Sequence, residues 1–201
     1  MNCKIILNTI KIPLIFIIIM WLIRFVEYYF QISLYYFGIF PRSCNGLIGI
    51  ITSTFIHLDF SHLINNTYPL IILGSLLFYF YKKKAFEIFF WLFFSSNLWL
   101  WCIGRANYHI GASSFVYAIA SFLFFSGLIK RKTRLSFVSL IIVFLYGSMI
   151  WGIFPLSNNI SWEGHIAGFF SGILLSIVYR NEGPKQKKYQ WEIDEEMEGE
   201  K

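Results

Sequence analysis

The feature that most constrains this chain is a series of apolar runs, each about long enough to cross a lipid bilayer. A spanning helix needs about 20 predominantly apolar residues. The composition agrees, because 57% of the 201 residues are hydrophobic and the mean hydropathy is +0.59. The sequence therefore predicts an all-α membrane protein. Its six expected spans lie near residues 12–37, 61–81, 86–104, 113–129, 135–153 and 163–179.

The runs divide the chain into one membrane domain, residues 1–180, and a short tail, residues 181–201. The first run is overlong, so we expect it to tilt or to end in an interfacial stretch at its tyrosines. The outer connection at 38–60 is apolar for a solvated loop and should pack against the bundle or dip into the outer leaflet. The tail is basic and then acidic, which is typical of a disordered cytoplasmic segment.

The basic residues follow a membrane pattern rather than that of a nucleic-acid-binding protein. The formal net charge is +6, but 14 of the 17 lysines and arginines precede the first run or follow the second, fourth and sixth. The opposite loops hold only Arg42 and Arg105, and Arg24 lies inside the first run. By the positive-inside rule both termini are cytoplasmic, and the first, third and fifth loops lie outside the cell membrane. The expected partner is the lipid bilayer, with no nucleic acid.

Four polar side chains lie within about one turn of the outer ends of three expected spans. His62 and Asn66, four residues apart on one helical face, begin the second span; Ser113 begins the fourth and His165 the sixth. Serines here can simply let helices pack closely, and a histidine at an interface can be structural. Polar groups in lipid are costly unless paired, so four of them at one depth predict a functional site.

A row of glycines in the sixth span predicts close packing that would bring the serine near the histidine. Gly164, Gly168 and Gly172 recur every four residues, a pattern that lets a neighbouring helix approach closely. The fourth span carries short side chains that fit this row, which would bring the Ser113 hydroxyl near the His165 imidazole. The third and fifth spans, rich in Phe and Trp, are expected to be scaffold without chemistry.

Metal-dependent enzymes and transporters are not supported by the sequence. The four histidines include no HExxH-type pair, and the three cysteines lack metal-ligand spacing, so no metal or other cofactor is expected. Arg24 and Glu27, three residues apart, are expected to neutralise each other. A transporter would need further charges inside the membrane or internal repeats.

Taken in order, these motifs resemble those of the rhomboid intramembrane serine proteases, over roughly residues 12–180. The resemblance lies in His62-x-x-x-Asn66, in Gly111-x-Ser113 with Tyr117 four residues later, in Gly164-His165-x-x-Gly168, and in Gly38-Ile39-Phe40-Pro41-Arg42 ahead of Gly46-Leu47-Ile48-Gly49-Ile50. It implies a six-transmembrane-helix rhomboid-like bundle with a long outer first loop. It also implies an endopeptidase that cleaves single-span transmembrane proteins near the outer membrane face without a cofactor.

The resemblance also implies a role for each candidate residue. Ser113 would be the nucleophile and His165 its general base, in a dyad without a carboxylate. Tyr117 would stack on His165 and hold its ring. The Ser113 backbone N–H, the His62 side chain and the Asn66 amide would stabilise the developing oxyanion.

One residue departs from the family pattern. Ser114 directly follows the expected nucleophile, where the family usually has glycine. Its extra bulk could shift the Ser113 backbone N–H that the oxyanion needs. The alternative to a protease is a catalytically inactive rhomboid-like protein that binds transmembrane segments, although such proteins often lack the Ser–His dyad that this chain retains.

Overall fold

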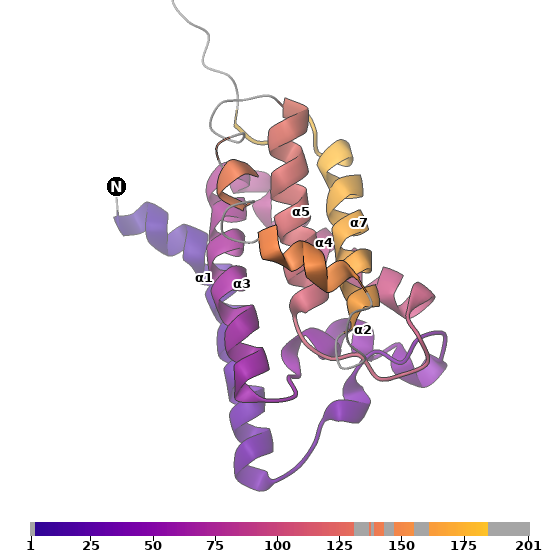
Figure 1. Ribbon diagram of the computed structural model, residues 1–201. Coiled ribbons are helices and arrows are strands. Elements are labelled where there is room, and N and C mark those ends of the chain that lie inside the picture. The colour runs from indigo at the N-terminus through magenta and orange to yellow at the C-terminus, as the bar shows by residue number, and fades with distance from the viewer. Residues whose placement is uncertain (1–2, 131–136, 138, 143–146, 155–160, 185–201) are drawn as a thin grey trace, which may run out of the picture.

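The computed structural model describes residues 3–130, 137, 139–142, 147–154 and 161–184, and within these residues it is helical without a strand (Figure 1). The predicted all-α fold is therefore confirmed. The long helices are α1 (Cys3–Phe30), α3 (Phe60–Tyr81), α4 (Ala85–Ile103), α5 (Ser113–Lys130) and α7 (Trp162–Val178). The short helices are η1 (Tyr35–Phe37), η2 (Cys44–Gly46), α2 (Gly49–Thr52), η3 (Ser53–Phe55), η4 (Lys82–Lys84) and η5 (Gly147–Ile153).

Three helical stretches of the described chain are long and apolar enough to cross a membrane. They are Leu7–Phe30, Phe60–Ile103 and Ser113–Lys130, and the second joins α3, η4 and α4. A further apolar helix, α7, is 17 residues long. The second, third, fourth and sixth predicted spans thus correspond to α3, α4, α5 and α7.

The first and fifth predicted spans differ from the other four. The α1 helix ends at Phe30 rather than near residue 37, because Gln31 takes a left-handed backbone conformation with φ of 53°. Residues 135, 136, 138 and 143–146 of the predicted fifth span, 135–153, lie outside the described residues; the rest is helical, and its last part forms η5. The predicted tail lies outside them from residue 185 onward.

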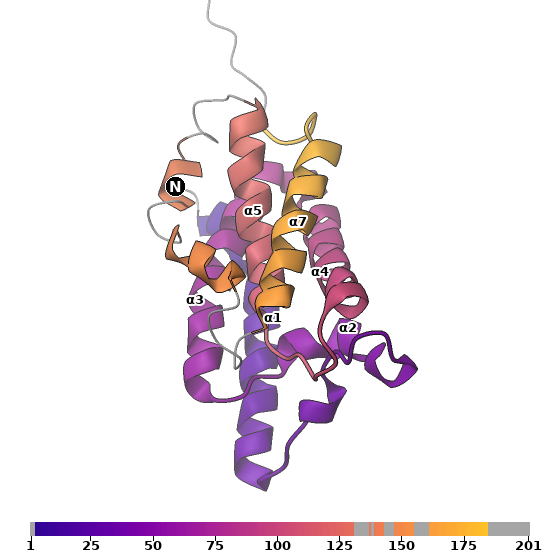
Figure 2. The same ribbon diagram turned by 45° about the vertical axis from the view of Figure 1, so that its right-hand side comes forward.

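The centre of the bundle is α5, of whose 18 residues 12 are buried. It packs most extensively against α7 and also contacts α3 and α4, and Figures 1 and 2 show α5 and α7 side by side. A methyl group on Gly168 would overlap the Ser114 carbonyl oxygen, and one on Gly172 would overlap the Ala118 carbonyl oxygen. The two helix backbones are therefore in contact along the glycine row, as its spacing predicts.

The third predicted span, expected to be scaffold without chemistry, contributes buried polar side chains to the bundle. Eight residues of α4 are buried, and they include the polar side chains of Ser96 and Asn97, both fully buried. The Phe- and Trp-rich composition hid this because a helix can present aromatic side chains to lipid and to protein at once.

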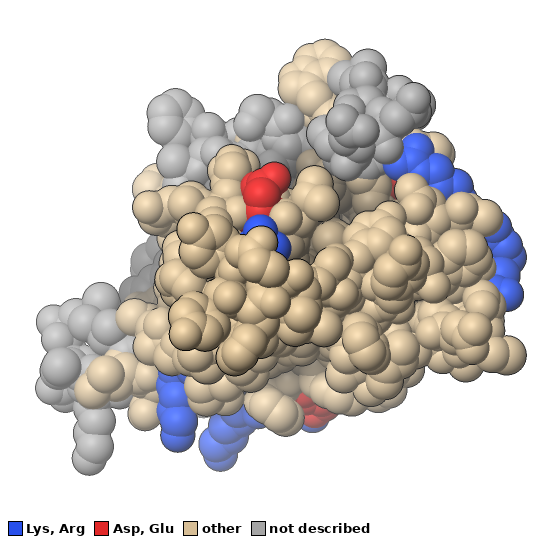
Figure 3. All heavy atoms as spheres, turned by 90° about the horizontal axis from the view of Figure 1, so that it is seen from below, with Lys and Arg blue, Asp and Glu red and all other residues tan. Residues whose placement is uncertain are grey.

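The first and third loops meet at the lower end of the bundle in Figure 1. Ile39 and His109 exchange two backbone hydrogen bonds of 2.8 and 2.9 Å, and the Gly111 N–H donates to the Ser53 carbonyl at 2.9 Å. Ile39 is fully buried, so the apolar first loop packs against the bundle. Figure 3 looks onto this end, where uncharged side chains make up most of the surface.

Charged side chains of the loops gather at the opposite end. Glu87 accepts hydrogen bonds from Lys84 at 2.9 Å and from the Tyr179 hydroxyl at 2.7 Å, which ties α4 to the end of α7. Lys130, the last residue of α5, lies 4.7 Å from the centre of the Tyr81 ring. The bundle thus has one basic end and one end built from the first and third loops.

Candidate active site

The first turn of α5 has free backbone donors beside the ring of His62. The Ala112 carbonyl accepts from the Val116 N–H at 2.9 Å, so the N–H groups of the three residues between them have no partner within the helix. Gly111 has a φ of +107°, and a methyl group there would lie 2.7 Å from His62 Nε2. Only glycine fits that conformation and that space. The His62 ring therefore lies against Gly111, two residues before the half-buried Ser113.

His165 is buried on α7, and two contacts orient its ring. Its Nδ1 lies 2.7 Å from the Gly152 carbonyl oxygen in η5. Because a carbonyl can only accept, Nδ1 must carry the proton, which leaves the lone pair of Nε2 free in the neutral ring. The Tyr117 ring stacks on the imidazole with centroids 4.1 Å apart and planes inclined by 6°. The ring is held as a general base requires.

Among the residues expected at the site, the structure places Tyr117 against His165 and the Asn66 amide on the His62 carbonyl. The Gly164 backbone faces the Ser114 Cβ, with 3.5 Å to a methyl group built on the glycine, so the first turns of α5 and α7 are in contact. No hydrogen bond joins the Ser113 hydroxyl to His165 among the contacts of these two described residues. Such catalytic hydrogen bonds are often long in the free enzyme and tighten when substrate binds.

His62 and Asn66 lie on one face of α3, as their spacing predicts. The Asp59 carboxylate caps the helix by accepting from the His62 backbone N–H at 2.7 Å. The Asn66 side-chain amide donates to the His62 carbonyl at 3.2 Å and is buried. The Asn66 side chain is therefore held by α3 itself, whereas the His62 ring lies against Gly111 of the third loop.

A second histidine that sequence reasoning overlooked lies beside His62. The ring centres of His57 and His62 are 5.0 Å apart, and His57 is 1% exposed. Neither ring nitrogen of His57 has a hydrogen-bond partner among the described residues. Burial lowers the pKa of His57 from 6.5 to about 3, helped by the charges of His62 and Arg24 and opposed by the Phe55 carbonyl and Asp59. His57 is therefore neutral at physiological pH.

This buried histidine makes the stability of the fold depend on pH. The unfolded chain takes up a proton at His57 near pH 6.5, and the folded chain only near pH 3, so stability is complete above about 6.5 and falls as the pH drops through that window. Between pH 7 and 4 the loss is at most on the order of 3 kcal/mol. We expect the thermal midpoint in detergent to fall over this range in the wild type and to fall less in His57→Gln, where buried His109 still contributes. If the thermal midpoint depended equally on pH in the two proteins, His57 would not be the source of the pH dependence.

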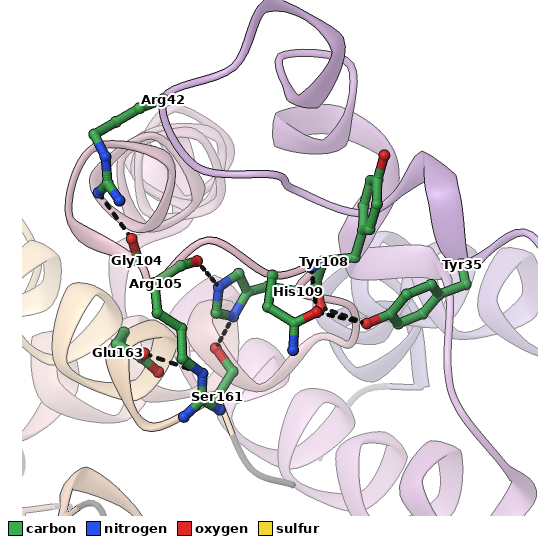
Figure 4. Close-up of polar contacts among 9 residues, drawn as sticks. Tyr35, Arg42, Gly104, Arg105, Tyr108, His109, Ser161 and Glu163 are labelled. Atoms are coloured by element: carbon green, nitrogen blue, oxygen red, sulfur yellow. Dashed lines mark hydrogen bonds and ion pairs between the residues drawn. The ribbon is translucent and has the colours of Figure 1, made fainter. Parts of the chain in front are cut away.

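A polar cluster ties the third loop to the start of α7 (Figure 4). It consists of Arg105, His109, Ser161 and Glu163, and we call it the outer cluster. His109 Nε2 lies 3.1 Å from the Arg105 carbonyl and so carries the proton, which leaves Nδ1 to accept from the Ser161 hydroxyl at 2.6 Å. Burial lowers the pKa of His109, opposed by the Arg105 carbonyl and Glu163, so the neutral ring that accepts from Ser161 is favoured.

The outer cluster also explains Glu163, which is 4% exposed and two residues from His165. Its carboxylate lies 3.4 Å from Arg105 Nε, an ion pair that crosses from the third loop to α7. Glu163 is therefore paired away from the histidine, consistent with a dyad that has no carboxylate. Neither the outer cluster nor the role of the Gly152 carbonyl could be predicted from the sequence. The cluster forms only when the loops pack together, and every residue has a backbone carbonyl.

No metal centre is formed in the part of the chain that the structure describes. No three His, Cys, Asp or Glu side chains gather there so as to hold a metal ion. The chemistry available to the described residues is that of a serine hydroxyl, a neutral imidazole with a free Nε2, and backbone and side-chain donors around them.

Comparisons with known proteins place the chain among membrane proteins of one family. A family model described as "Rhomboid domain" matches residues 45–182, which is more than half of the chain. An uncharacterized protein of Mycobacterium tuberculosis is 28% identical over 187 residues, covering 87% of this chain and 75% of the relative. An uncharacterized protein of Mycobacterium leprae is 28% identical over 189 residues, covering 87% and 72%. The family match therefore carries the functional argument, since these relatives are themselves uncharacterized.

Proposed function

We propose that this chain, which belongs to the rhomboid family, is an intramembrane serine endopeptidase with Ser113 as nucleophile and His165 as general base. Members of the family are generally serine proteases that act on transmembrane substrates within the lipid bilayer. The observation that carries the proposal is the state of the His165 ring. Its Nδ1–H is bonded to the Gly152 carbonyl and its face is stacked on Tyr117, which leaves Nε2 as the basic atom.

The proposed reaction uses these residues in two steps, the formation of an acyl-enzyme and its hydrolysis. The Ser113 oxygen attacks the substrate carbonyl while Nε2 of His165 takes the hydroxyl proton, and the same proton then passes to the leaving amine. Water attacks the acyl-enzyme, again giving up its proton to Nε2, and the Ser113 hydroxyl is restored. The Gly152 carbonyl stabilises the imidazolium that forms transiently, which is the orienting work that a carboxylate does in a triad.

The developing oxyanion has three candidate donors near the start of α5. They are the Ser113 N–H, which has no partner within the helix, the His62 ring, which lies against Gly111, and the Asn66 amide. Asn66 donates to the His62 carbonyl in the free protein, so its second amide hydrogen is the one available to substrate. Removing one oxyanion donor typically costs about two to three orders of magnitude in turnover.

The proposed substrate is a single-span transmembrane protein cut near the outer membrane face. The charge distribution supports cytoplasmic termini and a cell-membrane location, which put the end with the first and third loops outside. A substrate helix must unwind there to expose its backbone, so helix-weakening residues near the cut are expected. The alternative is a catalytically inactive rhomboid-like protein that binds transmembrane segments.

A serine-reactive fluorophosphonate distinguishes the protease from the binder. Purified wild-type protein should form a covalent adduct, and peptide mapping should find it on Ser113, the hydroxyl to which the proposal assigns His165 as base. Ser114 is the internal control, since it is 3% exposed and hydrogen-bonded to Asn97. An unlabelled wild type would favour the binder, and an adduct on Ser114 would show that the nucleophile is misassigned.

A further inference from the structure

The side chain of Ser114, the residue after the proposed nucleophile, points into the contact between α5 and α4. The Ser114 hydroxyl donates to Asn97 Oδ1 at 2.9 Å. Ser114 is 3% exposed and Asn97 is fully buried, so neither side chain can exchange this bond for one to water. A buried donor and acceptor that satisfy each other hold one arrangement strongly, because breaking the bond leaves both unpaired.

Asn97 is itself held by the first loop. Its side-chain nitrogen donates to the Ile50 carbonyl at 3.1 Å and to the Thr54 hydroxyl at 3.0 Å. Both amide hydrogens are thereby used, and the oxygen is turned toward Ser114. The bond therefore links the first turn of α5 to α4 and, through Asn97, to α2 and η3 of the first loop.

The backbone of Ser114 is held from the opposite side by α7. A methyl group on Gly168 would overlap the Ser114 carbonyl oxygen, so α7 lies directly against that peptide group. Ser114 is thus fixed through its side chain by α4 and through its carbonyl by α7. Ser113 is the residue before it, and its N–H and hydroxyl move with the same turn of backbone.

We propose that the Ser114–Asn97 hydrogen bond positions the first turn of α5 and so sets where the Ser113 hydroxyl and N–H point. This inference rests on the proposed protease function, and it makes Ser114 and Asn97 positioning residues, since neither has to touch substrate. Where the family usually has a glycine that lets helices approach, this chain has a side chain that is tied to α4. The hydrogen bond fixes the orientation of this turn of α5, where a glycine would leave the backbone more flexible.

Loss of the Ser114–Asn97 hydrogen bond should have a larger effect on turnover than on the binding of substrate. A displacement of about 1 Å at reacting groups can cost about a hundredfold in rate. We expect a smaller shift from a single lost bond, with kcat reduced about tenfold and KM unchanged in Ser114→Ala, because the contact acts on the reacting turn and not on the bound substrate helix.

A matched control lies two turns further along the same helix. The Ser121 hydroxyl donates to the Phe169 carbonyl on α7 at 2.7 Å and Ser121 is 5% exposed, so Ser121→Ala also removes one buried hydroxyl bond from α5. Both alanine variants should lower the thermal midpoint in detergent by similar amounts. Only Ser114→Ala should lower kcat for a single-span test substrate. Equal kcat in the two variants, with active wild type, would overturn this inference and leave the protease proposal standing.

A double-variant cycle shows whether Ser114 acts through Asn97. We expect Asn97→Ala to lower kcat, and Ser114→Ala/Asn97→Ala to lower it no further, because the two single changes break the same bond. Independent effects would multiply, giving about a hundredfold loss from two tenfold ones, and would overturn the link. A wild-type protein that neither cleaves the substrate nor reacts with a fluorophosphonate would overturn the protease proposal and this inference together.

Discussion

Ser113→Ala is expected to abolish cleavage of a single-span membrane substrate, with turnover at least about four orders of magnitude below the wild type. The change removes the attacking oxygen, and nothing else in the described site can replace it, because the Ser114 hydroxyl points at Asn97. His165→Ala should cost nearly as much, since the serine hydroxyl is a poor nucleophile without a base. Turnover is measured on purified variants in one detergent with the same substrate.

The two changes should not be additive. Ser113→Ala/His165→Ala should be no slower than either single variant, because nucleophile and base act as one unit. Each variant must keep the wild-type melting behaviour to within a few degrees, so that loss of activity is not loss of fold. Substantial cleavage by Ser113→Ala in a folded protein would refute the proposed nucleophile.

Gly168→Val is expected to lose at least about a hundredfold in turnover and to lower the thermal midpoint. The first carbon of a valine side chain would overlap the Ser114 carbonyl oxygen and come within 3.0 Å of the Tyr117 Cβ. The α5 and α7 backbones must then separate, which carries His165 away from Ser113 and costs about 1–3 kcal/mol of stability through overpacking. A misplacement of about 1 Å is enough for a hundredfold loss.

Leu174→Val is the control for this experiment. Leu174 lies on the same helix and is 51% exposed, on the face turned away from α5. Its substitution should change neither turnover nor the thermal midpoint appreciably. Wild-type behaviour from Gly168→Val would mean that α7 does not meet α5 at this glycine in the active protein.

The sequence was sufficient for features that leave a regular pattern. Long apolar runs gave the bounds of α3, α4, α5 and α7 to within a few residues, because helices in lipid must be long and apolar. The four-residue glycine spacing predicted the contact of α7 with α5. The spacing of His62 and Asn66 predicted a shared face, since residues four apart lie one above the other on a helix.

The features that the sequence could not supply depend on contacts between distant segments. The Ser114–Asn97 bond spans 17 residues and exists only because α4 and α5 pack side by side. Arg105 and Glu163 are far apart in the chain and meet only when the third loop covers the start of α7. His57 lies in the first loop, and only the folded chain shows that it is buried beside His62.

The group that orients His165 belongs to the main chain, and this affects what genetics can detect. Every residue has a carbonyl, so no substitution at position 152 deletes the acceptor; a larger side chain there acts only by crowding Tyr117 and His165. A scan of point mutations would therefore miss the orienting contact. Inserting or deleting one residue in η5 would reveal this contact, because the backbone register shifts by one residue and a different carbonyl, or none, then faces the imidazole. The function of this segment should therefore depend more on its length than on its amino-acid sequence.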